Sequence, residues 1–539
     1  INKLRPIVLL DVIQKGFWVI VISRITKVWE NNNILHPHQY GSRANKDATS
    51  ASLMATLLAE ESESTHKNFY AFACDCKRAY DSVETFVGKE MALRRLGVPE
   101  LIIKMITDMD LNNSAVVYTA FGMTDDILGE EGSFCYERGW TQGASESPSG
   151  WVSTYDILLT LLDTHTTNED LGCHLATISD KRHATAITAI AYVDDALLLA
   201  GSRHGIEYRA NIASLYFEFV GIQFNPDKSE VIGMEWIDGK AVDLASQSWK
   251  PIIYDSNILF ANGYVTLQPQ LNGHIQPPSI TNRCNGKSQV KVTALNTGIK
   301  YLGNTWSPKP NLTAISDNIA AEIEQNASII NHFSLEPESI LYLATAVSRA
   351  KFMYKTTCLN LTETQAKQIE QKIKKTFMKS IKMSSANTHL LSTPHSLTSI
   401  GWQPWFNTLM IKRLEMVTKH IRRDGVLGTL LRNSYRRYLR LSGDSELHNS
   451  ESTLHWENNP WLHHTLNWAK TYHITLHGKG LEHEKWNNDV RIVNLAKTTE
   501  ELKLLKKGCS ESKKYWMSQI ANTHYCPKAF HKKLFQDGK

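Results

Sequence analysis

Short apolar runs alternate with longer segments of helical periodicity over residues 1–303. The run FYAFACD at residues 69–75 follows a polar stretch and predicts a buried strand that ends on an acid. The run AYVDDALLLA at residues 191–200 predicts two strands joined by a hairpin with paired acids at its tip. This part of the chain therefore combines buried strands with helical segments.

Three segments in the same region predict helices. Residues 82–97 (SVETFVGKEMALRRLG) begin with a serine that can cap a helix and end at a glycine. Residues 99–110 (PELIIKMITDMD) begin with a proline, whose missing N–H is harmless in a first helical turn. Residues 149–163 (SGWVSTYDILLTLLD) place apolar side chains at helical spacing and begin just after Pro148.

The pattern changes twice further along the chain. Residues 233–298 include QPQLNGHIQPPSITNRCNGKS, which is rich in proline, asparagine and glycine and predicts an irregular insertion. Beyond Trp306 the periodicity becomes almost wholly helical. We therefore expect a separate helical domain to begin there.

The composition is that of a globular protein with more than one core, since 42% of the 539 residues are hydrophobic and 21% are charged. The net charge of +5 is unevenly spread. Residues 411–440 carry nine Lys or Arg against two acids, and residues 372–382 carry five lysines and no acid. A basic surface of this kind favours contact with a polyanion, although a solvated helix face has the same composition.

The eight cysteines show neither a disulfide framework nor the paired CxxC spacing of metal sites, which favours a reducing compartment. No apolar run in the sequence is long enough to cross a bilayer. We therefore expect an intracellular protein, nuclear or cytoplasmic, with no membrane contact.

Acids at the ends of predicted strands are the main chemical signal. A buried carboxylate is normally neutralised, paired or bound to a metal, so Asp194 and Asp195 indicate either a turn open to water or a cation site. If the strand ending at Asp75 is an antiparallel neighbour of the hairpin, all three acids can share metal ions. Two divalent cations are the usual device of phosphoryl transfer, and magnesium prefers carboxylate oxygen.

Seven stretches, in this order, resemble the motifs of one family. That family is the reverse transcriptase domain of non-LTR (LINE-type) retrotransposons, which is related to group II intron reverse transcriptases and to telomerase. The stretches are LRPIVLLDVIQKGFWVIVISRI (4–25), HQYGSR (38–43), DCKRAYDSV (75–83), GWTQGASESPSGW (139–151), AYVDD (191–195), GIQFNPDKSEVI (221–232) and YLG (301–303). The second departs from the family's Q-x-G-F-R pattern, because Ser42 replaces the aromatic residue.

The resemblance implies an α+β fold of the right-hand polymerase type. Residues 1–306 would form fingers and palm with an antiparallel sheet, interrupted by the insertion at 233–298. Residues 307–440 would form a basic helical thumb, and residues 441–539 a mostly helical C-terminal region of unknown role. Because the chain begins inside the family's opening finger motif, we expect a fragment of a longer protein.

The resemblance also implies a catalytic set. Asp75 and Asp194 would hold two Mg²⁺ ions, for which Mn²⁺ could substitute, with the backbone carbonyl of Cys76 as a further ligand. Asp195 would support the second metal and the primer end. Cys76 thereby also belongs to the nucleotide site.

Further residues would bind the incoming nucleotide. Tyr80 would lie under its sugar and exclude a 2′-hydroxyl by bulk, although an aromatic core residue is the alternative. Gln142 and Gly143 would form the floor on which the templating base and nucleotide pair, because glycine allows close backbone approach.

Three basic residues would contact the phosphates. Arg5 and Arg43 would clamp the triphosphate, since a planar guanidinium suits phosphate oxygens. Lys228 would supply a proton or positive charge to the departing pyrophosphate, although a plain turn lysine fits the sequence nearly as well.

The resemblance predicts an RNA-directed DNA polymerase whose partners are an RNA template, a DNA primer and deoxynucleoside triphosphates. The alternative is a catalytically inactive, polymerase-like RNA-binding module, which would need none of the acids. An RNA-directed RNA polymerase of the same architecture is disfavoured, because Tyr80 would hinder a ribose hydroxyl.

Overall fold

The computed structural model describes Leu9 and residues 11–111, 118–119, 122–123, 138–164, 187–253, 288–330, Ser339, 342–380, 404–421, Arg423, 425–442 and 460–471. The chain forms two compact units, residues 1–309 and residues 310–539.

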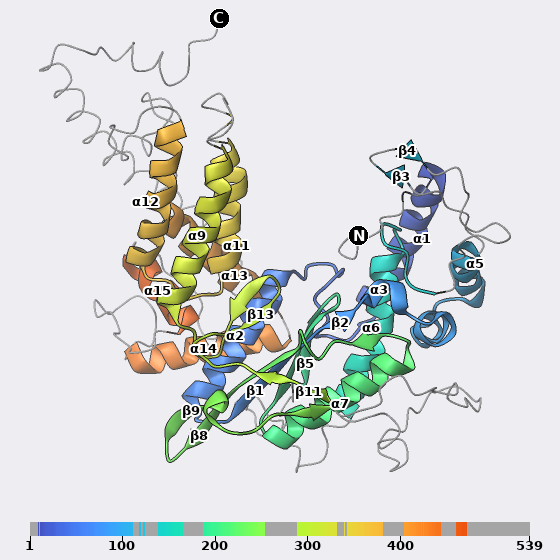
Figure 1. Cartoon of the computed structure of the whole chain (residues 1–539), viewed down its shortest axis with the longest axis horizontal. Coiled ribbons are helices and arrows are strands. Elements are labelled where there is room, and N and C mark those ends of the chain that lie inside the picture. Colours follow the sequence, from blue (N-terminus) through green and yellow to red (C-terminus); the bar gives the residue numbers. More distant parts are fainter. Residues whose placement is uncertain are drawn as a thin grey trace, which may run out of the picture. The chain divides into compact units, whose positions relative to one another are not determined.

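The first unit is built on a six-stranded sheet (Figure 1). Its strand order is β12 (Lys291–Val292), β8 (Glu230–Ile237), β1 (Phe69–Cys74), β6 (Asp195–Ala200) and β5 (Ala189–Tyr192), with β9 (Lys240–Asp243) paired to β8. All neighbours are antiparallel except β12 and β8. The predicted strand at 69–75 and the predicted hairpin at 191–200 are confirmed, and they are direct neighbours.

Shorter strand pairs and helices complete the unit. The pairs are β2 (Cys76–Lys77) with β7 (Gln223–Phe224), β3 (Tyr118–Thr119) with β4 (Gly122–Met123), β10 (Ile252–Ile253) with β11 (Ser288–Gln289), and β13 (Ile299–Tyr301) with β14 (Asn304–Trp306). The helices are α1 (Val12–Asn31), α2 (Ala48–Ser64), α3 (Ala79–Ser82), the π-helix η1 (Thr85–Met91), α4 (Ala92–Arg95), α5 (Glu100–Leu111), α6 (Ser147–Thr164), α7 (Arg203–Phe219) and the 3-10 turn η3 (Leu244–Ser246).

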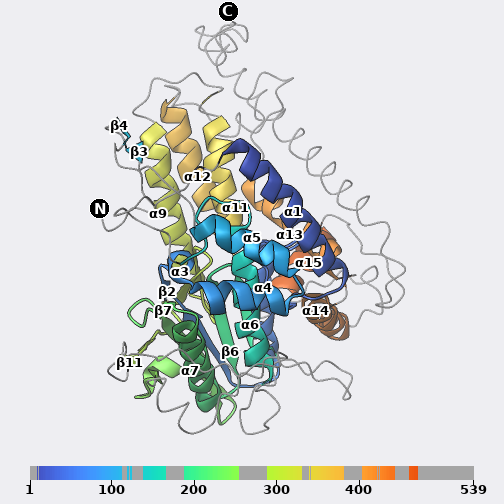
Figure 2. The same cartoon turned by 90° about the vertical axis from the view of Figure 1, so that its right-hand side faces the viewer.

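The central strand β1 is buried on both faces of the sheet. Tyr70, Phe72 and Cys74 belong to the main core, on the face that α7 covers; α7 packs on β1 and β6, and α6 packs on α7 (Figure 2). Side chains alternate along a strand, so Phe69 points to the other face. There its ring lies 6.1 Å from that of Trp306, in the β13–β14 hairpin.

The predicted helices form with local differences. The segment 82–97 becomes η1 and α4, and its cap is Glu84, whose side chain accepts the Val87 N–H, whereas Ser82 ends the preceding short helix. Helix α5 agrees with the prediction. Helix α6 begins at Ser147, so Pro148 lies inside its first turn, where a missing N–H costs no hydrogen bond.

The prediction of an irregular insertion at 233–298 is wrong for most of the residues described there. Strand β8 continues to Ile237 and folds back as β9, with Ile237 opposite Lys240. The turn between them is Asp238–Gly239, with φ of 49° and 74°, and this dipeptide suits the two positive φ angles of a tight hairpin. Residues 254–287, which carry most of the Pro- and Asn-rich sequence, lie outside the described part.

The described part of the second unit contains helices and no strand. Its helices are α9 (Leu312–Ile330), the π-helix η4 (Ala344–Arg349), α11 (Ala350–Thr356), α12 (Glu363–Ser380), α13 (Trp405–His420), α14 (Val426–Ser442) and α15 (Trp461–Thr471). Helix α12 packs on α9 and α13, and α15 packs on α13 and α14. No helix described in either unit is long and apolar enough to traverse a bilayer.

Part of the basic sequence at 411–440 serves the fold of this unit. Arg413 is fully buried, donates from Nε to the Thr357 carbonyl at 2.9 Å, and lies over the Trp461 ring at 5.5 Å. Arg432 donates to the carbonyl oxygen of Ile421, just beyond the end of α13, at 2.8 Å. Charge counted along the sequence therefore overstates the charge available to a polyanion.

Candidate active site

The strand register brings the predicted acids to one end of the sheet. In the antiparallel β1–β6 pair Cys74 lies opposite Ala196, so Asp75 and Asp195 are the next residues at the same end. Opposite residues of antiparallel strands have Cα atoms about 4.5 to 5.5 Å apart. Asp194 lies in the turn that joins Tyr192 to Asp195. Two stretches distant in sequence thus place their carboxylates together.

Asp75 is fixed by the stretch that follows α7. Its N–H donates to Ser229 Oγ at 3.0 Å, and its Oδ2 accepts from Asn225 Nδ2 at 2.6 Å. The N–H of Asn225 also donates to the Asp75 carbonyl at 3.0 Å. In this stretch the resemblance predicts a role only for Lys228, which is exposed in the turn. Asn225 and Ser229 were missed, although both belong to the quoted motif GIQFNPDKSEVI.

The acids are close enough to influence each other's ionisation. Partial burial raises the pKa of Asp195 to about 6, and the negative charges of Asp194 and Asp75 add to this effect. Burial also raises the pKa of the Cys76 thiol, and a hydrogen bond with Cys74 adds to that shift. A cation among these carboxylates would relieve their repulsion.

The donor chemistry fits a hard divalent cation, because the predicted ligands are carboxylate and carbonyl oxygens. Among the side chains that the structure describes, no three or more His, Cys, Asp or Glu are arranged to ligate an ion together. The metal roles of Asp75, Cys76, Asp194 and Asp195 therefore stay predictions.

Tyr80 lies between the acids and the core. Its ring stacks on Trp151 of α6, with centroids 4.8 Å apart and an interplanar angle of 19°. Burial raises the pKa of its hydroxyl, and the charge of Asp194 contributes to the same shift. The ring is therefore held rigidly near Asp194, an arrangement compatible with both the packing role and the steric role.

The stretch that contains Gln142 and Gly143 packs against the segment after β2. Gly139 donates its N–H to the Val83 carbonyl at 2.8 Å, and a Cβ at Gly139 would lie 2.8 Å from the carbonyl oxygen of Asp81. Gln142 Nε2 donates to Asp81 Oδ1 at 3.3 Å, and Gly143 is exposed with φ of 102°. The motifs at residues 75–83 and 139–151 thus form one surface.

Arg43 is engaged inside the protein. Its Nε and Nη2 each donate to the carboxylate of Glu30 at 2.8 Å, and its Nη1 donates to the His36 carbonyl at 2.6 Å. Only 5% of its side chain is exposed, and its hydrogen bonds lower the pKa of Glu30. The contact of Arg43 with a triphosphate stays a prediction that requires exchange of this partner. Arg5 lies outside the described residues.

The hairpin turn itself is strained. Val193 has φ of 59°, in the left-handed region that β-branched residues avoid. Residues held in such conformations cluster at active sites and require support from their surroundings. The support comes from Gln39 and Gly41, which sequence reasoning left without a role although both stand in the quoted HQYGSR motif.

Comparison with known proteins identifies a family for this chain. The profile of the family described as "Reverse transcriptase (RNA-dependent DNA polymerase)" matches residues 1–305, more than half of the chain. No curated protein matches the sequence. A solved structure of telomerase from Candida albicans, in complex with a TWJ fragment of telomeric RNA, is similar with a TM-score of 0.29 and 12% identity. The similarity covers 74% of this chain and 56% of that one.

The family has the right-hand polymerase fold, which accords with the mixed helices and antiparallel sheet of the first unit. With its matched profile and its acids at one end of that sheet, the chain belongs to the reverse transcriptase family of RNA-directed DNA polymerases.

Proposed function

We propose that the chain is the polymerase of a non-LTR (LINE-type) retrotransposon and extends a DNA primer on an RNA template by two-metal nucleotidyl transfer. The observation that carries this proposal is the register that sets Asp75 beside Asp194 and Asp195. The order of the seven quoted motifs supports the retrotransposon subtype.

In this reaction the 3′-hydroxyl of the primer attacks the α-phosphorus of a nucleotide and pyrophosphate leaves. Asp75, Asp194 and the Cys76 carbonyl would hold the two Mg²⁺ or Mn²⁺ ions, with Asp195 supporting the second ion and the primer end. When bound, the ions activate the attacking oxygen and stabilise the leaving one. The protein contributes position: Asn225 and Ser229 orient Asp75, and positioning and charge neutralisation carry most of such catalysis.

The nucleotide would lie between the acids and the surface formed by Gln142 and Gly143. Tyr80, braced by Trp151, would pack under its sugar and exclude a 2′-hydroxyl. Arg5, Arg43 and Lys228 would contact the phosphates. For Arg43 this requires the guanidinium to leave Glu30, which a triphosphate of higher charge can drive.

Residues 307–440 would form the thumb and contact the RNA template and DNA primer through those basic side chains that remain exposed. Cys74 and Cys76 are joined by a hydrogen bond and not by a disulfide, which supports an intracellular setting in the nucleus or cytoplasm.

A primer-extension assay tests the proposal. The purified chain is incubated with a primed RNA template, deoxynucleotides and Mg²⁺, and extension that stops on chelation is expected. The variant Asp75→Asn should lose extension and keep template binding, whereas Asp227→Asn, at an exposed acid of the nearby turn, should behave as the parent.

The same assay separates the second candidate, an inactive RNA-binding module. The buried Arg43–Glu30 pair favours that candidate, because a guanidinium so engaged does not face a nucleotide. Parent protein that binds the primed template with ordinary affinity and does not extend it, in Mg²⁺ or Mn²⁺, would overturn the polymerase proposal and support the module.

A further inference from the structure

Residues 38–41 cover the outer edge of the hairpin that carries Asp194. Gln39 pairs in parallel with Ala191 of β5. The Tyr40 N–H donates to the Ala191 carbonyl at 2.7 Å, and the Ala191 N–H donates to the His38 carbonyl at 3.0 Å. The segment therefore acts as a short extra strand that ends beside the turn.

The side chain of Gln39 reaches from this segment to the strained residue. It is fully buried, and its Oε1 accepts from the N–H of Val193 at 3.2 Å and from the N–H of Gly41 at 2.9 Å. Two donors at one atom identify that atom as the oxygen. The Nε2 of Gln39 has no hydrogen-bond partner in the described structure, so the amide acts here through its oxygen, as an acceptor.

Gly41 packs against the backbone of Val193. A Cβ built at Gly41 would lie 2.3 Å from the nitrogen of Val193 and 3.0 Å from its Cα. Any side chain at Gly41 would thus displace the turn or the segment. The close approach, and not a positive φ, explains the glycine.

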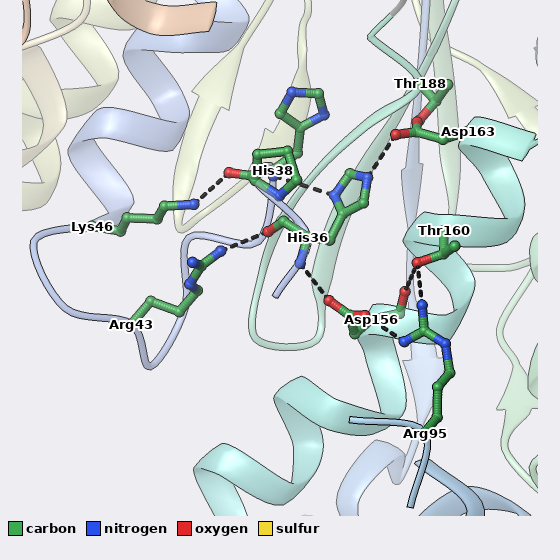
Figure 3. A network of polar contacts seen from close by, with 10 residues as sticks. His36, His38, Arg43, Lys46, Arg95, Asp156, Thr160, Asp163 and Thr188 are labelled. Carbon is green, nitrogen blue, oxygen red and sulfur yellow. Dashed lines mark hydrogen bonds and ion pairs between the residues drawn. The ribbon is translucent and has the colours of Figure 1, made fainter. Parts of the chain in front are cut away.

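His36, two residues before this segment, anchors it to helix α6, as Figure 3 shows. The His36 N–H donates to Asp156 Oδ1 at 2.5 Å, and His36 Nε2 lies 2.7 Å from Asp163 Oδ2. Arg95 Nη1 holds the other oxygen of Asp156 at 2.6 Å. Because α6 belongs to the packed core, the segment offers a rigid base from which to hold the turn.

We propose that Gln39 and Gly41 form a clamp that keeps Val193 in its left-handed conformation and thereby positions Asp194 for nucleotidyl transfer. This rests on the proposed function. Gln39 is a positioning residue, since it acts on Asp194 through the backbone of Val193. Displacements near 1 Å at a reacting centre reduce rates strongly, so the clamp affects kcat more than substrate binding.

Hydrogen exchange and kinetics together test the clamp. In Gln39→Leu the Val193 N–H loses its acceptor, so its exchange, followed by mass spectrometry of peptides spanning 189–197, should become at least about tenfold faster. Peptides of β1 should exchange as in the parent. In primer extension kcat should fall at least about tenfold, while KM for nucleotide and primer–template changes less than about twofold.

Two further variants complete the design. Tyr40→Phe removes only the hydroxyl that contacts Met54 Sδ at 2.9 Å, and it should match the parent in both measurements. Gln39→Glu retains an oxygen acceptor for both N–H groups and should keep the slow exchange at Val193. If Gln39→Leu does not fold, the exchange rate of the Val193 N–H in Gln39→Glu alone tests the clamp.

The outcomes are separable. Unchanged exchange at Val193 in Gln39→Leu, fast exchange in Gln39→Glu, or an unchanged kcat in an active Gln39→Leu would each overturn the clamp. A parent that fails to extend primers would instead overturn the proposed function. The exchange of Gln39→Leu against the parent would still decide whether Gln39 holds the turn.

Discussion

Two tight hairpin turns of the same sheet are built in opposite ways. The β8–β9 turn uses Asp238 and Gly239, which adopt positive φ at little cost, and a Cβ at Gly239 would meet nothing within 4 Å. The β5–β6 turn uses Val193 at φ of 59°, and Gly41 packs directly on its backbone. The first turn follows from its own residues, whereas contacts from a distant segment impose the second.

The difference indicates what each turn is for. A turn that only reverses the chain is best made from residues that favour it. A turn whose residues disfavour its conformation persists only when the surrounding structure over-determines it, and such strain is typical of functional sites. The strained turn is also the one that carries Asp194 beside Asp75. Substitutions at equivalent places of the two turns should therefore separate folding from catalysis.

The largest effect is expected at the acid of each turn. Asp194→Asn should lower the primer-extension rate at least about a thousandfold, because a neutral amide neither holds a cation nor offsets its charge. Asp238→Asn, at an exposed residue that asparagine replaces well in a hairpin turn, should leave the rate unchanged. Single-nucleotide extension rates measure both, and circular dichroism checks that both variants are folded. Synthesis by Asp194→Asn near the parent rate would refute the catalytic assignment.

The second effect uses the glycine nearest each turn. Gly41→Ala should lower kcat about a hundredfold, since its Cβ would lie 2.3 Å from the Val193 nitrogen. Gly239→Ala forces a residue with a Cβ to φ of 74°, which should cost about 1 kcal/mol of unfolding free energy and no activity. Urea denaturation and extension kinetics give both quantities. The comparison fails if Gly41→Ala keeps its kcat, or if Gly239→Ala loses activity while folded.

Much of the sheet could be predicted because its signals are local. The strand at 69–74 and the hairpin at 189–200 are apolar runs bounded by polar residues, and the structure has both. The β8–β9 hairpin was equally readable from Asp238–Gly239. The Pro- and Asn-rich sequence further on dominates the composition of residues 233–298 and hides this local signal.

The acids of the site could be predicted from the sequence, whereas most of the contacts around them could not. Asp75 follows an apolar run, and Asp194 and Asp195 lie at the tip of a predicted hairpin, so their meeting needed only that two strands be neighbours. The Arg43–Glu30 pair depends on where the end of α1 lies relative to the loop after it, which no local pattern specifies. The same holds for Gln39, whose partner Val193 is distant in sequence, and for Asn225, which orients Asp75.

The third effect concerns the aromatic residue near each turn. Tyr80→Ala should admit ribonucleotides, raising their incorporation relative to deoxynucleotides at least about tenfold, because a bulky ring no longer meets the 2′-hydroxyl. Trp236, on β8 beside the other turn, stacks on His66 with centroids 4.2 Å apart. Trp236→Ala should lower stability and leave this selectivity unchanged. Competition between ribonucleotides and deoxynucleotides measures the selectivity. The control variant Tyr80→Phe keeps the bulk of the ring and should retain the selectivity of the parent. Unchanged selectivity in Tyr80→Ala would show that Tyr80 is only a packing residue.

The smallest effect lies in the strain itself. Val193→Asn replaces a β-branched residue at positive φ by one that tolerates it, so the free energy of unfolding should stay equal or rise by up to about 1 kcal/mol. Asp238→Val makes the reverse change at φ of 49° and should cost about 1 to 2 kcal/mol. Urea denaturation of the two variants beside the parent gives both values. If Val193→Asn lowered the free energy of unfolding as much as Asp238→Val does, packing of the valine side chain would outweigh its backbone strain. The two turns would then differ in residue type and not in stored strain.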